Sequence, residues 1–467
     1  MLVSASATEP FGLSCTPMKP TAPGPSGPTL LRQIRAIQRD PLQFLLDCAQ
    51  TYGGVVQFPV GDWPVYAVND PDGIKHVLQD NHRNYSKDTV QFNTLALVTG
   101  QGLLTSDGDY WLRQRRMLQP AFHRQRITGF GAAMVGATER LLARWDLLAP
   151  PAALDVDAEM MALTLEIVGR TLFTADLSHA ARDLVSAVLI ALDYIIYRAQ
   201  TPLSLPLFLP TPRNLKFRNA LQTLDHAVSR LVADRRALAA ETPRPNDLLQ
   251  MLLDARGEDG TPMSDTQLRD EIITLIIAGH ETVASALTWT WYLLAENPAV
   301  EARLGAELAG VLDGRPPTME DLPCLTYTRA VLDEALRLYP PAWLITRKAL
   351  DADVVAGHAL PAGSLVIISP YVVHRRAEAW PEPERFQPER FLDGQTSAAP
   401  RFTYLPFGGG PRLCIGNLFA LTEGVLILAT VAQRYQLRLT PGHGVRVDPL
   451  VTIRPHGGLP MQLIRRS

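Results

Sequence analysis

The most informative pattern in the chain is Phe407-Gly408-Gly409-Gly410-Pro411-Arg412-Leu413-Cys414-Ile415-Gly416. It places one cysteine behind a glycine-rich bend and ahead of an apolar run of helical character, residues 418–431. At a helix N-terminus, unpaired N–H groups and the helix dipole favour negative charge, and Arg412 adds a positive charge two residues away. Both effects lower the pKa of a thiol, so we expect Cys414 to be a thiolate. A thiolate is the axial ligand that a haem iron uses for oxygen-activating chemistry.

The spacing F-x-x-G-x-R-x-C-x-G resembles the haem-binding signature of the cytochrome P-450 family, and every fixed position is matched. The resemblance implies haem b (iron protoporphyrin IX), with Cys414 as the metal ligand and O2 as co-substrate. The cofactor-binding residues that it implies in this loop are Phe407, Gly408, Gly410, Arg412, Cys414 and Gly416. The alternative is a structural cysteine behind a glycine loop. A phosphate-binding loop is excluded, because no Gly-Lys-Ser/Thr follows the glycines.

Length and composition set the broad class. The chain has 467 residues, of which 46% are hydrophobic, and this is ample for a large core. Its net charge of −3 does not indicate a nucleic-acid partner. The four cysteines have neither disulfide-framework density nor CxxC spacing, which favours a reducing, cytoplasmic setting. No window reaches about 18 uninterrupted apolar residues, so we expect no transmembrane anchor, as in the soluble bacterial members of the family.

The chain divides into two parts. Residues 1–28 are rich in Pro, Ser, Thr and Gly and are expected to form a disordered extension, in which Met18 is an alternative start to Met1. Residues 29–467 are expected to form a single helix-rich α+β domain, mostly α with small β-sheets, which is also the fold that the family resemblance implies. Within it we predict a hairpin at 55–58 and 65–68, a proline-broken segment at 201–213, and strands at 353–355 and 365–369.

A long apolar helix is predicted to begin at the capping-box pattern Ser264-Asp265-Thr266-Gln267 and to end near Asn297-Pro298. Ala278-Gly279-His280-Glu281-Thr282 lies midway along it. Gly and Thr weaken a helix locally, so we expect an opening there that holds a ligand or water. The segment resembles the family's A-G-x-[DE]-T motif, which implies that Glu281 and Thr282 are catalytic and deliver protons. A zinc H-E-x-x-H site is excluded, because position 284 is Ala.

Two arginines and a glutamate resemble a structural triad of the family. Glu334 and Arg337 share a helix face, and alone they would mean little. The resemblance identifies them as the E-x-x-R motif and nominates Arg390 as the third member.

Haem propionates require cationic or N–H donors. Besides Arg412, the W-x-x-x-R pair Trp111 and Arg115 resembles the family's propionate clamp, and His374 and Arg347 fall in regions that sometimes contribute. The basic run of Arg113, Arg115, Arg116, His123, Arg124 and Arg126 is either a solvated face or a docking surface for an acidic electron carrier. The resemblance implies electrons from NAD(P)H through separate partners, a ferredoxin or flavodoxin and a ferredoxin reductase.

The substrate follows from resemblance alone. Residues 283–289, 336–347 and 452–460 look like those of bacterial beta-carotene hydroxylases of this family, which implies hydroxylation of a carotenoid ionone ring. The residues expected at the substrate are Ile276, Ile277, Ala278, Ala342, Trp343 and Leu344. Another terpenoid or a fatty acid is the alternative substrate, and a lipophilic substrate makes peripheral membrane contact an option. The alternative from a different functional class is a non-catalytic haem-binding sensor. Glu281 and Thr282 disfavour it, because a sensor does not need proton delivery.

Overall fold

A single long helix organises the molecule. In the computed structural model, α11 (Asp265–Glu296) begins at a complete capping box: the Ser264 side chain accepts from the Gln267 backbone N–H at 3.2 Å, and the Gln267 side chain accepts from the Ser264 N–H at 2.9 Å. It ends before Asn297-Pro298, because the residue before a proline is disfavoured in the α conformation. At about 1.5 Å per residue the helix is about 48 Å long. Both predicted ends are confirmed.

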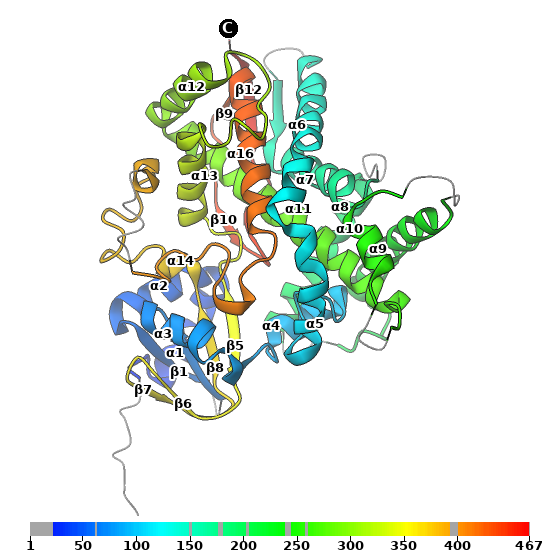
Figure 1. Cartoon of the computed structure of the whole chain (residues 1–467). Helices are drawn as coiled ribbons and strands as arrows, with labels where there is room; N and C mark the ends of the chain where they lie inside the picture. The colour runs from blue at the N-terminus through cyan, green and yellow to red at the C-terminus, as the bar shows by residue number, and fades with distance from the viewer. Residues whose placement is uncertain are drawn as a thin grey trace, which may run out of the picture.

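The structure describes residues 22–60, 63–148, 152–175, 181–201, 205–238, 244–256, 260–392 and 400–466. The remaining helices lie around α11 or beside the strands (Figure 1). They are α1 (Gly27–Arg39), α2 (Pro41–Tyr52), α3 (Pro71–Lys75), α4 (Val90–Thr99), α5 (Gly108–Leu118), α6 (Arg124–Asp146), α7 (Val156–Leu172), α8 (Ala181–Gln200), α9 (Pro212–Arg236), α10 (Leu248–Asp254), α12 (Pro298–Leu312), α13 (Thr326–Leu338), α14 (Pro370–Val373) and α16 (Asn417–Arg434).

The strands form small sheets beside the helices, as predicted for a mostly α protein. One sheet has the order β1-β2-β8-β5-β3, another β4-β12-β9, and β10-β11 and β6-β7 are two-stranded. Their bounds are β1 (Val55–Val60), β2 (Trp63–Val68), β3 (Tyr85–Ser86), β4 (Ala152–Asp155), β5 (Ile345–Ala349), β6 (Asp353–Val355), β7 (His358–Leu360), β8 (Leu365–Ile368), β9 (Tyr435–Leu439), β10 (Val447–Pro449), β11 (Ile453–Pro455) and β12 (Pro460–Arg465).

The predicted local elements are found where the structure describes them. β1 and β2 pair as an antiparallel hairpin, and β6 and β8 coincide with the predicted strands. The proline-broken segment separates α8 from α9, with residues 205–211 irregular and 202–204 outside the described residues.

Part of the expected disordered extension is ordered. Ala22 is buried, and the carbonyl of Pro23 accepts from the Gln57 N–H of β1 at 2.8 Å. Helix α1 already begins at Gly27, before the predicted boundary. Composition alone does not reveal this contact with β1, which orders the end of the extension. Residues 1–21 lie outside the described part of the chain.

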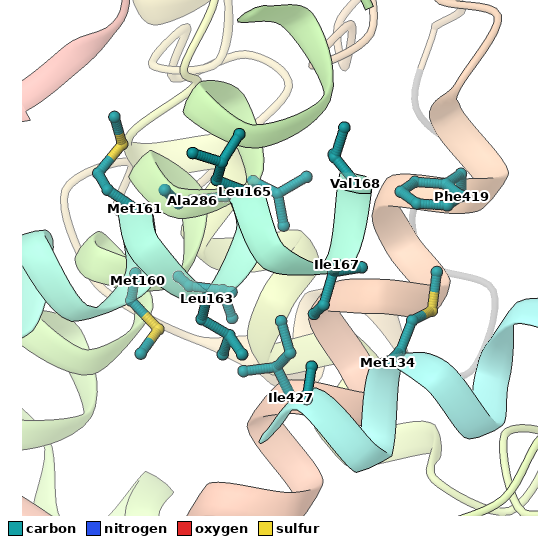
Figure 2. Close-up of a cluster of buried hydrophobic side chains, with 14 of the residues drawn as sticks. Met134, Met160, Met161, Leu163, Leu165, Ile167, Val168, Ala286, Phe419 and Ile427 are labelled. Carbon is teal, nitrogen blue, oxygen red and sulfur yellow. The ribbon is translucent and has the colours of Figure 1, made fainter. Parts of the chain in front are cut away.

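The core lies where α6, α7, α11 and α16 meet. Figure 2 shows Met134 of α6, Ile167 of α7 and Ile427 of α16 gathered in this cluster. Gly279 allows the close approach of α11 to α7, since a β-carbon there would lie 2.9 Å from Val168. Helix α11 is long and apolar enough to span a membrane, but 83% of its most apolar window is buried in the protein, so it is a core helix.

Candidate active site

The cysteine loop is shaped by two glycines with positive φ. Gly408 has φ 73° and Gly410 has φ 65°, and a β-carbon on Gly410 would come within 1.9 Å of the Leu78 carbonyl oxygen. The Cys414 N–H donates to the Phe407 carbonyl at 3.0 Å and closes the loop. Helix α16 begins directly after it, with Gly416 at the N-cap. The signature residues therefore hold Cys414 just ahead of a helix N-terminus, as predicted.

The loop forms one wall of a cavity of about 360 Å³ lined mostly by apolar side chains. The cavity also takes in the middle of α11 and the segment after α13. The predicted site residues that line it are Trp111, Arg115, Ile277, Ala278, Glu281, Thr282, Ala342, Leu344, Arg347, Phe407, Gly408, Arg412, Cys414 and Gly416. Side chains from distant parts of the sequence thus meet around Cys414.

Opposing effects act on the thiol of Cys414. Burial raises the pKa of its thiol, and the Gly416 backbone N–H and the charge of Arg115 lower it only in part. The thiol opens onto the cavity, and the nearby arginine that acts on it is Arg115 rather than the Arg412 that the sequence suggested. A bound metal cation stabilises a coordinating thiolate outright.

Four cations line the cavity: Lys87, Arg115, Arg347 and Arg412. Burial lowers the pKa values of Arg347 and Arg412 to about 10, and that of Lys87 falls well below its usual range for the same reason, with the neighbouring arginines contributing. Asp107 is the carboxylate beside them: it pairs with Arg412 and accepts from the Lys87 backbone N–H at 2.6 Å. Positive charge therefore exceeds negative charge in this buried place.

Lys87 is the member that sequence reasoning missed. Its ammonium donates to the Leu104 carbonyl at 2.6 Å and lies 4.6 Å from the centre of the Phe92 ring. The lysine stands in no motif, so only its burial beside the arginines reveals it. Arg412 stacks on Trp111, with its guanidinium carbon 3.7 Å from the ring centre, while Arg115 donates to the Leu413 carbonyl at 2.9 Å.

The acid and alcohol on α11 both line the cavity, but the expected opening is not there. The helix is α-helical throughout residues 265–296, and the Thr282 hydroxyl donates to the Ala278 carbonyl at 2.9 Å. Glu281 is buried and accepts from the Thr452 hydroxyl at 2.5 Å. Burial raises the pKa of Glu281 to about 7. An acid with such a pKa gives up and takes back a proton near neutral pH.

The three triad residues come together in the core, between α13 and the segment that follows α14. The side chains of Glu334 and Arg337 are fully buried (0% exposed) and pair at 2.6 Å, and Arg390 lies 3.4 Å from Glu334. Arg337 also donates to the carbonyls of His374, Pro383 and Arg385. The network ties α13 to the meander that follows α14.

His374, Trp343, Ile276 and Gly410 are not among the residues that line the cavity. His374 accepts from the Leu405 N–H at 2.9 Å, and its other ring nitrogen faces the Arg337 carbonyl at 3.1 Å, so the assignment to cofactor binding is corrected to a structural one. Trp343 donates to the Leu450 carbonyl at 2.8 Å in a separate aromatic core, and Ile276 is a buried core residue on another face of α11. Because adjacent residues of an α-helix point in different directions, Ile277 lines the cavity while Ile276 does not.

The residues around the cavity fit a haem. Cys414 offers a sulfur ligand, and the buried excess of cations matches two carboxylates of the kind that the propionates supply. Gly408, Gly409 and Gly416 line the cavity together with Cys414. The four cations, with Trp111 beside Arg412, are the groups that would hold the propionates.

Comparison with known proteins agrees with this site. A sequence model of the cytochrome P450 family matches residues 22–453. The chain is 38% identical over 437 residues to a cyclooctat-9-en-7-ol 5-monooxygenase of Streptomyces melanosporofaciens, covering 93% of each chain. It is 36% identical over 435 residues to a pentalenene oxygenase of Streptomyces avermitilis, covering 92% of this chain and 94% of the relative. It is 33% identical over 465 residues to the chloroplastic protein LUTEIN DEFICIENT 5 of Arabidopsis thaliana, covering 95% of this chain and 77% of the relative. The chain belongs to the cytochrome P450 family and is a monooxygenase of that family.

Proposed function

We propose that this monooxygenase hydroxylates an apolar isoprenoid, with Cys414 holding the haem iron and Glu281 and Thr282 delivering protons. The observation that carries the proposal is one apolar cavity lined both by the cysteine loop and by the acid–alcohol pair of α11. The bound haem supplies O2 activation and insertion of one oxygen atom into a C–H bond. The protein's own residues hold the propionates, exclude water and keep a proton donor at the cavity wall.

The lining favours a substrate that has few polar groups. Phe92, Leu95, Ala342, Leu344 and Val451 all face the cavity. A hydrocarbon gains free energy by leaving water for such a surface, at about 25 cal/mol for each Å² of apolar area. Polar substrates would leave their groups unpaired there, at a cost of about 1–3 kcal/mol each.

Two isoprenoid classes compete. The relatives named for cyclooctat-9-en-7-ol and pentalenene match along nearly their whole length, which favours a compact terpenoid. The relative named for lutein, a carotenoid, matches over less of its own length and supports the ionone ring of a carotenoid as the second candidate. We therefore place the compact terpenoid first.

A binding and product assay separates the two classes. The haem-loaded protein is titrated with pentalenene, a cyclic diterpene alcohol and β-carotene, and the shift of the haem absorption band is followed. Products are then identified after turnover with a surrogate ferredoxin system. Hydroxylated terpenoid with no carotenoid product is the expected result. Carotenoid hydroxylation alone would reverse the order, and turnover of a fatty acid but neither isoprenoid would overturn the proposal.

The roles of Cys414 and Thr282 are tested separately. Cys414→Ser should abolish the absorption band of the reduced carbon-monoxide complex that is typical of thiolate ligation, and retention of that band would remove Cys414 as the ligand. Thr282→Ala should retain haem and substrate but release peroxide in place of product. Wild-type product yield per reductant in this variant would exclude Thr282 from proton delivery.

We further propose that a small acidic ferredoxin, working in the cytoplasm, docks on the basic run. Arg113, Arg116 and Arg124 are exposed, and the described residues place no carboxylate within ion-pair distance of them. Arg126 differs, since it donates to the Asn246 carbonyl at 2.8 Å. The exposed Leu413 belongs to the cysteine loop, to which Arg115 of the same run donates. Unpaired surface charge of one sign raises the encounter rate with a partner of the other sign.

A further inference from the structure

A cluster of buried polar side chains lies behind the cavity, where α11 meets α7 and the segment around β11. Its members are Asp157, His280, Glu281, Thr452 and Arg454, and each is no more than 9% exposed. Polar and charged groups in a core are costly unless they are paired, so such a cluster requires a reason. Glu281 and Thr452 also line the cavity, which connects the cluster to the site.

Each contact in the cluster crosses between distant segments. The Thr452 hydroxyl donates to Glu281 at 2.5 Å, although the two residues are 171 positions apart. The guanidinium of Arg454 pairs with Asp157, which also accepts from the Thr288 hydroxyl at 3.4 Å. Strand β11 is fixed to α11 by separate bonds, since Ser285 donates to the Ile453 carbonyl at 2.6 Å.

We propose that Thr452 and Arg454 are positioning residues for the proton-delivering acid: Thr452 holds the Glu281 carboxyl at the cavity wall, and Arg454 holds Asp157 in the same cluster. This inference rests on the proposed catalytic role of Glu281. The C-terminal segment would thus act on the reaction through a side chain of α11 and without contact to the haem.

The groups of the cluster shift the pKa of Glu281 in opposing directions. Burial raises the pKa of Glu281 to about 7, the Thr452 hydroxyl and the charge of Arg454 lower it, and the charge of Asp157 raises it. Burial also raises the pKa of Asp157. His280 faces the same cluster; burial lowers its pKa to about 4, and its Nε2 has no hydrogen-bond partner among the described residues, so it stays neutral. Because Thr452 lowers the pKa of Glu281 and Asp157 raises it, substitutions at these two residues should shift that pKa in opposite directions.

The test follows the protonation of Glu281 in the haem-loaded enzyme. Infrared difference spectra over pH report the carbonyl stretch of the protonated carboxyl, which Glu281→Gln identifies by its loss. Thr452→Val removes a donor to the carboxylate and should raise the titration midpoint by about one pH unit. Thr452→Ser should restore it. Asp157→Asn removes a negative charge and should move the midpoint in the opposite direction.

Ser285→Ala is the matched control, because it removes a hydroxyl bond between α11 and the same segment without touching Glu281. It should leave the midpoint and the product yield per reductant unchanged, whereas Thr452→Val should lower that yield by about tenfold. An unmoved midpoint in Thr452→Val, or an equal shift in Ser285→Ala, would overturn the inference. If Glu281→Gln keeps its full product yield, the catalytic role of Glu281 fails instead, while the infrared midpoints still decide whether Thr452 controls its proton.

Discussion

Replacing Arg337 with methionine should prevent the enzyme from accumulating as a haem-loaded protein. Arg337 and Glu334 are both fully buried (0% exposed) and joined by two bonds of 2.6 and 2.8 Å. Breaking a buried pair by removing one partner costs about 3–5 kcal/mol. The carbonyls of His374, Pro383 and Arg385 lose their donor as well, at about 1–3 kcal/mol for each that water cannot reach.

These losses are comparable to the whole stability of a typical protein, about 5–15 kcal/mol. The variant should therefore show a strongly lowered urea midpoint and little haem for each polypeptide. Burial raises the pKa of Glu334, and Arg337 counteracts this. Without the arginine, Glu334 can escape part of the cost by taking up a proton. The destabilisation should consequently be larger at pH 8 than at pH 5.

Arg385→Met is the matched control. Arg385 also pairs with a glutamate three residues away, Glu382, at 3.1 Å, but both side chains are exposed (64% and 67%). An exposed pair contributes about 0–1 kcal/mol, so the urea midpoint should hardly move. A wild-type urea midpoint and haem content in Arg337→Met would refute the reasoning that the buried pair supports the cysteine loop.

Three further predictions concern other buried and surface charges. Burial raises the pKa of Glu271 to about 7, above its value in the unfolded chain, so the contribution of this carboxyl to stability is lost as pH rises through 7. In thermal unfolding, Glu271→Gln should therefore be about 2–3 kcal/mol more stable than wild type at pH 8, but not at pH 4.5. Lys87→Met should speed the transfer of haem to apomyoglobin by about tenfold, whereas Lys348→Met, at an exposed lysine, should not. Equal transfer rates in the two variants would remove Lys87 from the propionate site. Neutralising Arg116 and Arg124 together should lower ferredoxin-supported turnover and weaken its dependence on salt, while peroxide-driven turnover stays unchanged; equal losses in both assays would mean that the arginines support the fold.

Features that depend on neighbours along the chain were predictable from the sequence. The cysteine loop could be recognised because its glycines, Arg412 and Cys414 stand at fixed short spacings, and Gly408 and Gly410 do adopt positive φ. The capping box at Ser264 and the stop before Pro298 bounded α11 correctly for the same reason. The family resemblance then supplied the long-range pairing of Arg390 with Glu334, which no spacing encodes.

Which side chains face the cavity, and how their pKa values shift, depends on tertiary packing. Lys87, far from the motif in sequence, joins the cations around Cys414, while His374 turns to backbone groups of Leu405 and Arg337. The raised pKa of Glu281 comes from burial, which depends on everything packed around the carboxyl. Contacts such as that between Thr452 and Glu281, 171 positions apart, arise when separate elements fold against each other, and no local pattern records them.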